Sequence, residues 1–247
     1  MTSPDIYLSI IVPAYNEAAR IGKTLERLSR YLAQATFTSE ILVVIDGSQD
    51  RTREAAERFA VEKRDLKIID RAINRGKGYT VKEGMLAARG QIRLFTDADN
   101  STDISHFDKM KPFFDDGYDA VIASRSAKDA AQAQQAVPQA AYKRVIGQIG
   151  NRVVQAVSVP GIWDTQCGFK AFRTQAAQRI FSQVTIERWG FDIEVLALAR
   201  AFNYKIGIVP AHWINDERSH VKLPDYLRVL ADTFTVRRNL LAGKYDL

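Results

Sequence analysis

The sequence contains a single cysteine, Cys167, among 247 residues. One cysteine cannot form an internal disulfide, so nothing in the composition points to an oxidising compartment. No uninterrupted apolar run reaches the roughly 18 residues of a membrane-spanning helix, so none is expected. Residues 1–7 lack a basic stretch followed by an apolar one, so a signal peptide is not expected either. Any membrane contact is therefore expected to be peripheral.

The motifs of several ligand-binding classes are also missing. The sequence has no helix-turn-helix or zinc-knuckle spacing, and its aromatic residues are not interleaved with basic runs, so no nucleic-acid partner is expected. It has no Walker lysine motif, and Gly76-Lys77-Gly78 lacks the third glycine of a dinucleotide fingerprint. What the chain does have is positive charge. A net charge of +6 and a pI near 9.4 favour an anionic partner, such as a membrane surface or a phosphorylated small molecule.

Apolar runs alternate with helical patterns along the first half of the chain. Patterns typical of buried strands occur at residues 8–12, 41–45, 66–69, 92–95 and 120–123, with helical stretches after them. This alternation predicts an α/β domain with a mostly parallel central sheet flanked by helices and joined by right-handed crossovers. Ligands of such sheets bind at the carboxyl ends of the strands.

The pattern changes after Ser124. Residues 130–136 are rich in alanine and glutamine, and they are expected to form a loop or a short exposed helix. Farther on, the sequence predicts helices over 142–157 and 191–202, short strands near 169–172 and 206–209, and a last helix that Pro224 opens. No linker marks a boundary, so residues 1–247 are expected to form a single domain.

The strongest chemical signal is Asp97-Ala98-Asp99, directly after a predicted strand. Two carboxylates at this spacing can bind one hard cation, and Mg²⁺ or Mn²⁺ is usually held by one or two carboxylates together with substrate phosphates. Such a metal would act as a Lewis acid on a departing diphosphate. Two alternatives stay open. Both aspartates could cap the next helix, or Asp97 could be the nucleophile and Asp99 the general acid of a haloacid-dehalogenase-like phosphatase. That phosphatase fold normally starts with this motif, whereas here three strand–helix units precede it.

Three further polar segments, at residues 13–17, 46–50 and 74–78, also follow predicted strands. Asp46 is suited to accept a hydrogen bond from a base or a ribose hydroxyl. Lys77 can place a cation beside a phosphate that approaches the backbone of its two flanking glycines. Each segment alone is typical of a turn with a helix cap. Four such segments in order, each at a strand's carboxyl end, favour one shared ligand site.

With these four segments the sequence resembles the family 2 glycosyltransferases, which share the GT-A nucleotide-sugar fold. The resemblance runs from Leu8 to about Leu241. It also includes residues 123–125, 164–170 and 188–194. The last two resemble the dolichyl-phosphate glucosyltransferases and, more loosely, the dolichyl-phosphate mannose synthases. One departure is Ile45, which stands where the family often has the first aspartate of Asp-Asp-Gly-Ser.

The resemblance implies an inverting, metal-dependent hexosyltransferase with a dolichyl-phosphate beta-glucosyltransferase-like activity. The implied donor is UDP-glucose, ahead of GDP-mannose, and the implied acceptor is a polyprenyl or dolichyl phosphate. Asp97 and Asp99 would bind Mg²⁺ or Mn²⁺. The implied donor-binding residues are Pro13, Tyr15, Glu17, Asp46, Lys77, Asp97 and Ala98, and the candidate catalytic residues are Asp97, Asp99, Asp192 and Arg125.

The acceptor side follows from the chemistry of a phosphate nucleophile. A polyprenyl phosphate is already nucleophilic, so transfer to it needs cations and no strong base. The candidates are Arg125, Lys143 and Arg144, with Lys170 and Arg173 behind them, although a solvated basic face is the alternative reading. A sugar hydroxyl on a polysaccharide or glycolipid is the alternative acceptor, and Asp192 would then be the candidate base.

Within the domain, residues 1–123 are expected to bind the nucleotide sugar and residues 124–222 the acceptor. Residues 223–247 are expected to form a C-terminal amphipathic helix. This helix either packs on protein or lies on an anionic bilayer, and Asp225 and Asp232 are expected to weaken its basic face. The expected location is cytoplasmic, with peripheral contact at the cytosolic face of a membrane.

Overall fold

The computed structural model describes residues 6–62, 65–135, 141–213 and 223–247. Its main sheet has seven strands in the order β3-β2-β1-β4-β7-β5-β8. These are β1 (Leu8–Ala14), β2 (Ser39–Asp46), β3 (Leu66–Arg71), β4 (Ile92–Thr96), β5 (Ala120–Ser124), β7 (Phe169–Arg173) and β8 (Ile206–Pro210). A small second sheet pairs β6 (Gln134–Gln135) with β9 (His212–Trp213).

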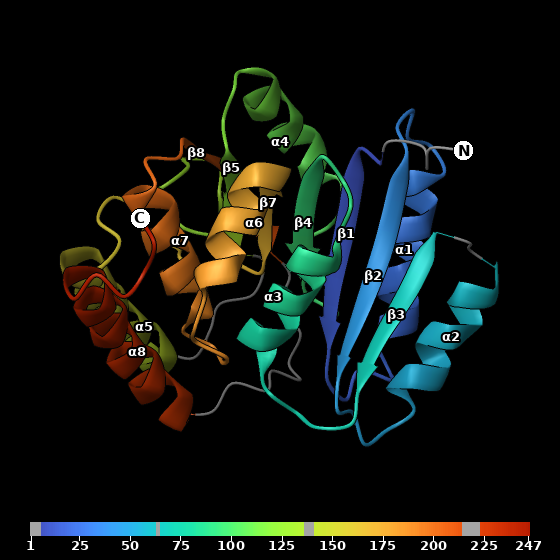
Figure 1. The fold of residues 1–247 in the computed structure, drawn as a ribbon, viewed down its shortest axis with the longest axis horizontal. Helices are drawn as coiled ribbons and strands as arrows, with labels where there is room; N and C mark the ends of the chain where they lie inside the picture. Colours follow the sequence, from blue (N-terminus) through green and yellow to red (C-terminus); the bar gives the residue numbers. More distant parts are fainter. Residues whose placement is uncertain (1–5, 63–64, 136–140, 214–222) are drawn as a thin grey trace.

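The main sheet is parallel except for one strand. β1 pairs in parallel with β2 and β4, β2 with β3, and β5 with β8. β7 runs antiparallel between β4 and β5. The predicted mostly parallel sheet is therefore confirmed. Because the other strands share one direction, their carboxyl ends meet at one edge of the sheet, the lower edge in Figure 1.

Helices cover both faces of the sheet. One face carries α1 (Ile21–Leu32), α2 (Thr52–Glu62) and α4 (His106–Asp115), and the other carries α3 (Lys77–Ala87), α6 (Thr174–Gln183) and α7 (Phe191–Ala201) (Figure 1). The remaining helices, α5 (Ala141–Val157) and α8 (Leu223–Leu241), pack against each other, and α8 also contacts α7. Within the described residues, no helix combines the length and the hydropathy that crossing a bilayer requires.

β1 illustrates why the sequence folds in layers. Leu8, Ile10 and Val12 belong to the core beneath α1 and α4, whereas Ile11 belongs to the core beneath α3. All seven residues of β1 are buried, which accounts for its nearly continuous apolar run. Each fully buried aliphatic side chain of this kind stabilises the fold by about 1.5–3 kcal/mol.

The predicted helices are confirmed with small shifts at their ends, but α6 was not predicted. Residues 130–133 form no helix, Gln134 and Gln135 form β6, and Ala136 lies outside the described residues. The buried residues of α6 recur at the spacing of a helix face, so the signal was present in the sequence: Ala176, Ala177, Ile180 and Phe181.

Candidate active site

The loops that follow β1 and β2 are hydrogen-bonded to each other at the carboxyl edge. The backbone N–H of Asn16 donates to Ser48 Oγ at 3.0 Å, and that of Glu17 donates to Thr52 Oγ1 at 2.7 Å. The Asn16 side chain accepts from the backbone N–H of Gln49 at 2.8 Å. Asn16 has a φ of 55°, a left-handed conformation that asparagine tolerates better than most residues. These contacts give the first part of the edge a fixed shape.

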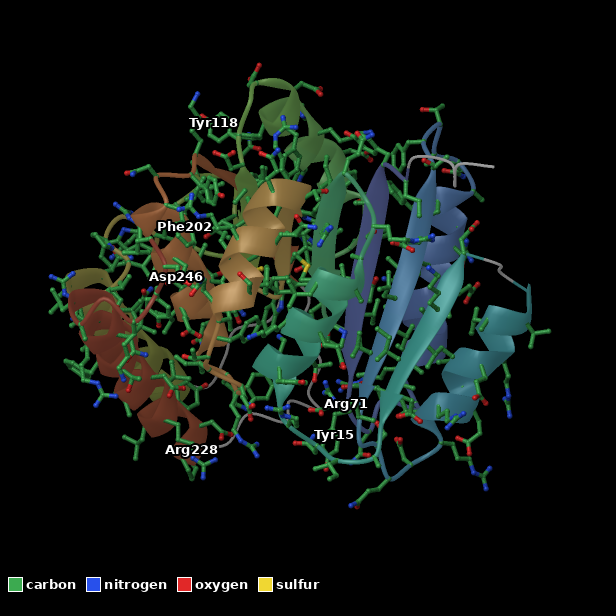
Figure 2. All side chains as sticks on the ribbon, viewed as in Figure 1. Tyr15, Arg71, Tyr118, Phe202, Arg228 and Asp246 are labelled. Atoms are coloured by element: carbon green, nitrogen blue, oxygen red, sulfur yellow. The ribbon has the colours of Figure 1, made fainter. Side chains whose placement is uncertain are left out.

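The predicted donor residues of β1 and its loop lie on this fixed part of the edge. Tyr15 is 39% exposed and lies at the lower edge of the molecule (Figure 2). Pro13 is buried within β1. The carboxylate of Glu17 is buried and forms a two-point ion pair with Arg20. Tyr15 therefore presents the more accessible side chain to a ligand.

Asp46, the last residue of β2, organises the next loop. Its Oδ1 accepts from Arg71 at 2.5 Å and from the backbone N–H of Arg75 at 2.8 Å, and its Oδ2 accepts from the N–H of Gly76 at 2.7 Å. Gly76 has a φ of 108°, which only glycine adopts readily. The structure thus shows Asp46 holding the loop that leads to Lys77, while its contact with a base or ribose stays a prediction.

Lys77 opens α3 and forms an ion pair with Asp97 across the edge, with Nζ 2.6 Å from Oδ1. Its ammonium also lies 5.5 Å from the centre of the Trp189 ring. Burial lowers the pKa of Lys77, but the charges of Asp97, Asp192 and Asp99 outweigh burial and leave that pKa raised. The site therefore contains a fixed cation beside the predicted metal ligands.

Asp97 directly follows β4 and lies against Gly168, the residue just before β7. Its N–H donates to the carbonyl of Gly168 at 3.2 Å, and a Cβ atom at Gly168 would overlap the Asp97 carboxylate. The next residue, Ala98, is buried in the core, and its carbonyl accepts from Thr24 at 2.6 Å. Tertiary contacts therefore position Asp97 from both sides.

Asp99 is held by its own loop. Its carboxylate accepts from the N–H of Ser101 at 2.9 Å. Burial, and then the negative charge of Asp97, raise the pKa of Asp99. Beside it, the side-chain nitrogen of Asn100 is buried without a hydrogen-bond partner among the described residues. A buried donor of this kind is suited to an anionic oxygen.

These residues fit a divalent cation shared with a substrate. The negative charge of Asp97 disfavours the ionisation of Asp99, and a cation relieves this repulsion. Among the described residues, no group of three or more histidine, cysteine, aspartate or glutamate side chains is arranged to hold a metal by itself. The arrangement thus suits Mg²⁺ or Mn²⁺ that completes its coordination with phosphate oxygens and water.

Asp192 and Lys170 form a buried pair beneath the site. Lys170 Nζ lies 2.5 Å from Asp192 Oδ1 and donates to the carbonyl of Cys167 at 2.7 Å. Both side chains are almost completely buried. Burial raises the pKa of Asp192, and the charge of Lys170 opposes that shift. The predicted roles of Asp192 in catalysis and of Lys170 in phosphate binding stay predictions.

Arg125 follows β5 and is held by Asp164, a contact that sequence reasoning missed. The guanidinium binds both carboxylate oxygens of Asp164 at 2.8 Å, and the Arg125 N–H donates to the same carboxylate at 2.7 Å. Asp129 in turn accepts from the backbone N–H groups of Trp163 and Asp164. The Trp213 ring lies 5.3 Å from the guanidinium. Arg125 is therefore a preorganised cation at this edge.

No contact among the described residues links Arg125 to the other predicted acceptor cations. Lys143 and Arg144 belong to the first turn of α5, but their side chains lie outside the described part of the structure. Arg173 pairs with Ile92 at the start of β4, and it donates to the carbonyl of Tyr118 at 2.9 Å. That position is at the opposite edge of the sheet, so the prediction that Arg173 stands behind the acceptor site is wrong.

Comparisons with known proteins show the family of the chain. The family profile described as "Glycosyl transferase family 2" matches residues 9–181. The chain is 33% identical over 243 residues to a dolichyl-phosphate beta-glucosyltransferase of Trichomonas vaginalis, with 94% of this chain and 73% of that protein covered. It is 32% identical over 258 residues to the dolichyl-phosphate beta-glucosyltransferase of Homo sapiens, with 99% of this chain and 79% of that protein covered.

Two solved structures share the fold. Mannosyl-3-phosphoglycerate synthase from Rubrobacter xylanophilus has a TM-score of 0.70 at 16% identity, covering 98% of this chain and 76% of that one. Glucosyl-3-phosphoglycerate synthase from Mycobacterium tuberculosis, in complex with Mg²⁺ and uridine diphosphate, has a TM-score of 0.68 at 16% identity. That match covers 94% of this chain and 80% of the mycobacterial chain. At this identity the likeness concerns the fold alone.

Proposed function

Because the chain belongs to glycosyl transferase family 2 and has the GT-A fold, we propose that it transfers glucose from a nucleotide sugar to a polyprenyl or dolichyl phosphate. The observation that carries this proposal is the Lys77–Asp97 ion pair beside Asp99, at the carboxyl edge of the sheet. It occurs in a chain 32% identical, over nearly its whole length, to a dolichyl-phosphate beta-glucosyltransferase. Family membership leaves the phosphatase alternative without support.

The donor is proposed to lie along the ends of β1, β2 and β4. UDP-glucose is preferred to GDP-mannose because the relatives are named as glucosyltransferases and a structural neighbour holds uridine diphosphate. The base and ribose are proposed to bind near Pro13, Tyr15, Glu17 and Asp46. Asp46 contributes in a second way, because it anchors the loop that presents Lys77.

Asp97 and Asp99 are the residues that would hold Mg²⁺ or Mn²⁺. A bound metal supplies charge neutralisation to the departing diphosphate. The chain's own contribution is to keep two carboxylates and one ammonium within reach of the same oxygens. With Asp97 engaged in holding the metal, Lys77 would be free to pair with a phosphate oxygen. Asn100, next to Asp99, offers a further buried donor.

The acceptor phosphate is proposed to approach from the side of Arg125. Asp164 fixes the guanidinium, so little side-chain freedom is lost when a phosphate binds it. Lys143, Arg144 and Lys170 remain proposed partners of that phosphate. An oxygen of the acceptor attacks the anomeric carbon while the bond from that carbon to the diphosphate breaks on the opposite side. The configuration at the anomeric carbon is therefore inverted.

A sugar hydroxyl is the weaker acceptor, because it needs a base. The candidate base, Asp192, is almost completely buried and its Oδ1 is already paired with Lys170, so it is poorly placed to take a proton from a hydroxyl. A phosphate acceptor makes no such demand. Since polyprenyl phosphates reside in bilayers, we further propose that the enzyme works as a peripheral protein at the cytosolic face of a membrane.

The test is transfer of radiolabelled glucose from UDP-glucose to a polyprenyl phosphate, followed by organic extraction. We expect label in the organic phase, dependent on both acceptor and divalent metal, and little label from GDP-mannose. Asp97→Asn serves as the inactive control, because it removes one proposed metal ligand with little change in volume. Label that appears only in water-soluble polymer would contradict the lipid-phosphate acceptor, and release of free phosphate from small phosphoesters would contradict the transferase.

A further inference from the structure

α8 leaves three large apolar side chains on the molecular surface. Leu227 is 68% exposed, Phe234 is 56% exposed and Leu241 is 73% exposed. They are spaced by seven residues, close to two helical turns, so they form one stripe along the helix. The opposite side of α8 packs inward, where Thr233 and Val236 are completely buried. The stripe is therefore separate from the core.

Exposed arginines border this stripe. Arg228, Arg237 and Arg238 are all exposed. A helix turns by about 100° per residue, which places Arg238 directly next to the stripe. Arg237 lies farther around the helix on one side of the stripe, and Arg228 farther around on the other. Lys244, just beyond the helix, is exposed as well. The outward half of α8 thus combines an apolar stripe with a basic border.

The acidic residues of α8 are on its inward half. The Asp225 side chain is only 15% exposed. Asp232 packs against α7, because a Cβ atom at Gly190 would overlap its carboxylate. Asp225 Oδ1 nevertheless lies 3.9 Å from Arg228 Nη1, so it partly offsets the charge of Arg228, as expected, and Arg237, Arg238 and Lys244 supply the rest of the basic border. From Pro224 to Leu241, the outward half of the helix carries positive charge without acidic side chains.

We propose that the outward half of α8 docks on an anionic lipid bilayer. The apolar stripe enters the interfacial region while the arginines contact lipid phosphates, as in helices that lie in the plane of a membrane. This inference deepens the proposed function and rests on it, because the proposed polyprenyl phosphate acceptor is what brings the enzyme to a bilayer. The first turns of α8, where Arg228 is labelled, lie at the same lower edge as Tyr15 and Arg71 (Figure 2). Docking there places the carboxyl edge of the sheet beside the lipid phosphates.

A second copy of the chain fits this surface less well. In a two-fold dimer the same patch faces itself, so the basic border of one copy, formed by Arg228, Arg237 and Arg238, would lie near the basic border of the other. Like charges brought together across an interface are unfavourable. An anionic bilayer offers the opposite charge to all three side chains.

Flotation with lipid vesicles tests the inference. The wild-type protein is expected to float with phosphatidylcholine vesicles that contain phosphatidylserine, and to stay behind with phosphatidylcholine alone. Replacing Leu227, Phe234 and Leu241 together by glutamine should weaken vesicle binding by about tenfold or more. Val61→Gln is the matched control, because Val61 on α2 is 89% exposed and should not affect binding. Equal flotation of the wild type and the triple variant would overturn the proposal.

A fluorescent label reports whether the stripe itself enters lipid. Cys167, the only cysteine, is buried, so Phe234→Cys can be labelled selectively with an environment-sensitive dye. The emission should shift to the blue on addition of anionic vesicles, whereas a label at Val61→Cys should not shift. A blue shift that depends on protein concentration without vesicles, together with dimers in sedimentation velocity, would overturn the proposal in favour of a second copy.

These readouts separate the docking from the proposed function. Flotation and dye emission require no sugar transfer, so they support docking even if polyprenyl phosphate proves not to be the acceptor. Transfer can also be measured without a membrane, with a detergent-soluble short-chain polyprenyl phosphate as the acceptor. The triple variant should use this acceptor at the wild-type rate although it no longer floats with vesicles. Transfer by a wild-type protein that never floats would refute the docking alone.

Discussion

At the scale of single residues, the contact between Asp97 and Gly168 matters most for the proposed chemistry. A Cβ atom at Gly168 would overlap the Asp97 carboxylate, so Gly168→Ala must displace a proposed metal ligand. A displacement of about 1 Å can reduce the rate about a hundredfold. We expect a loss of that order, together with weaker manganese-dependent binding of uridine diphosphate.

The control for this prediction is Gly147→Ala in α5, where an added Cβ meets no atom within 4 Å. It should leave transfer and binding unchanged. A midpoint temperature of unfolding for Gly168→Ala close to that of the wild type would show that the effect is local. Full activity in Gly168→Ala would show that Asp97 does not need this position.

The Arg125–Asp164 pair predicts a pH-dependent contribution to stability. Burial raises the pKa of Asp164, but the charge and hydrogen bonds of Arg125 outweigh burial and hold that pKa below its ordinary value. The folded state therefore binds this proton less readily than the unfolded state does. The stabilisation is present above roughly pH 4 and is lost as the pH falls through the folded-state pKa.

Asp164→Asn should accordingly lower the free energy of unfolding by about 3 kcal/mol at pH 7, because it leaves Arg125 largely buried without its counter-ion. Urea unfolding of the two proteins between pH 7 and pH 3 measures this difference. The difference should shrink as the pH falls below about 4, because the unfolded wild type then takes up a proton on Asp164 that the folded state binds less readily. A difference that stays constant over this range would be inconsistent with the pair as described.

Single residues also mark the limit of sequence reasoning. Asp97, Asp99 and Lys77 stand out because polar side chains directly follow strand patterns. The contacts of Asp164 and Gly168 were not predicted, because their partners are 39 and 71 residues away in the chain and are brought close by the pairing of β7 with β5 and with β4. Local periodicity contains no information about such partners.

At the scale of elements, the C-terminal segment is tied to the active-site region through α7. Tyr245 donates to Glu194 Oε1 at 2.7 Å, and Glu194 also accepts from the backbone N–H groups of Thr185 and Ile186. Glu187, the residue after Ile186, contacts the first turn of α3, since its carbonyl accepts from the N–H of Tyr79 at 3.0 Å. Glu194 thus connects the end of the chain to the start of α3.

Tyr245→Phe should therefore lower the free energy of unfolding by about 1 kcal/mol, the usual loss for one hydrogen bond. Amide hydrogen exchange should become faster at residues 185–187 and remain unchanged in β1 and β2. Tyr204→Phe is the control, because no described hydrogen bond involves the Tyr204 hydroxyl. Unchanged exchange at residues 185–187 in Tyr245→Phe would mean that the tail does not support this segment.

Elements differ in how readily the sequence reveals them. β1, β2 and β4 were predicted because burial on both faces leaves a continuous apolar run. β7 was predicted as a strand, but its antiparallel direction was not, because side-chain periodicity is the same in either direction. α6 was overlooked even though its buried positions repeat at helical spacing.

At the scale of the whole molecule, the site draws on both halves of the chain. Lys77 and Asp97 come from residues 1–123, whereas Trp189 and Gly168 come from residues 124–222. β7 joins the halves, because it lies between β4 and β5 in one continuous sheet. The proposed division into a donor half and an acceptor half is therefore a division of roles within a shared sheet.

The central claim is that a divalent cation on Asp97 and Asp99 binds the diphosphate of the donor. Calorimetric titration of uridine diphosphate, with Mn²⁺ and with a chelator, tests it most directly when the wild type is compared with Asp99→Ala. The wild type should bind uridine diphosphate at least about tenfold more tightly with Mn²⁺, because Asp97 and Asp99 would hold the ion and it would supply positive charge to the phosphates. Asp99→Ala should lose this gain while remaining folded. Equal affinity of the wild type with and without Mn²⁺, or a full gain in Asp99→Ala, would contradict the account.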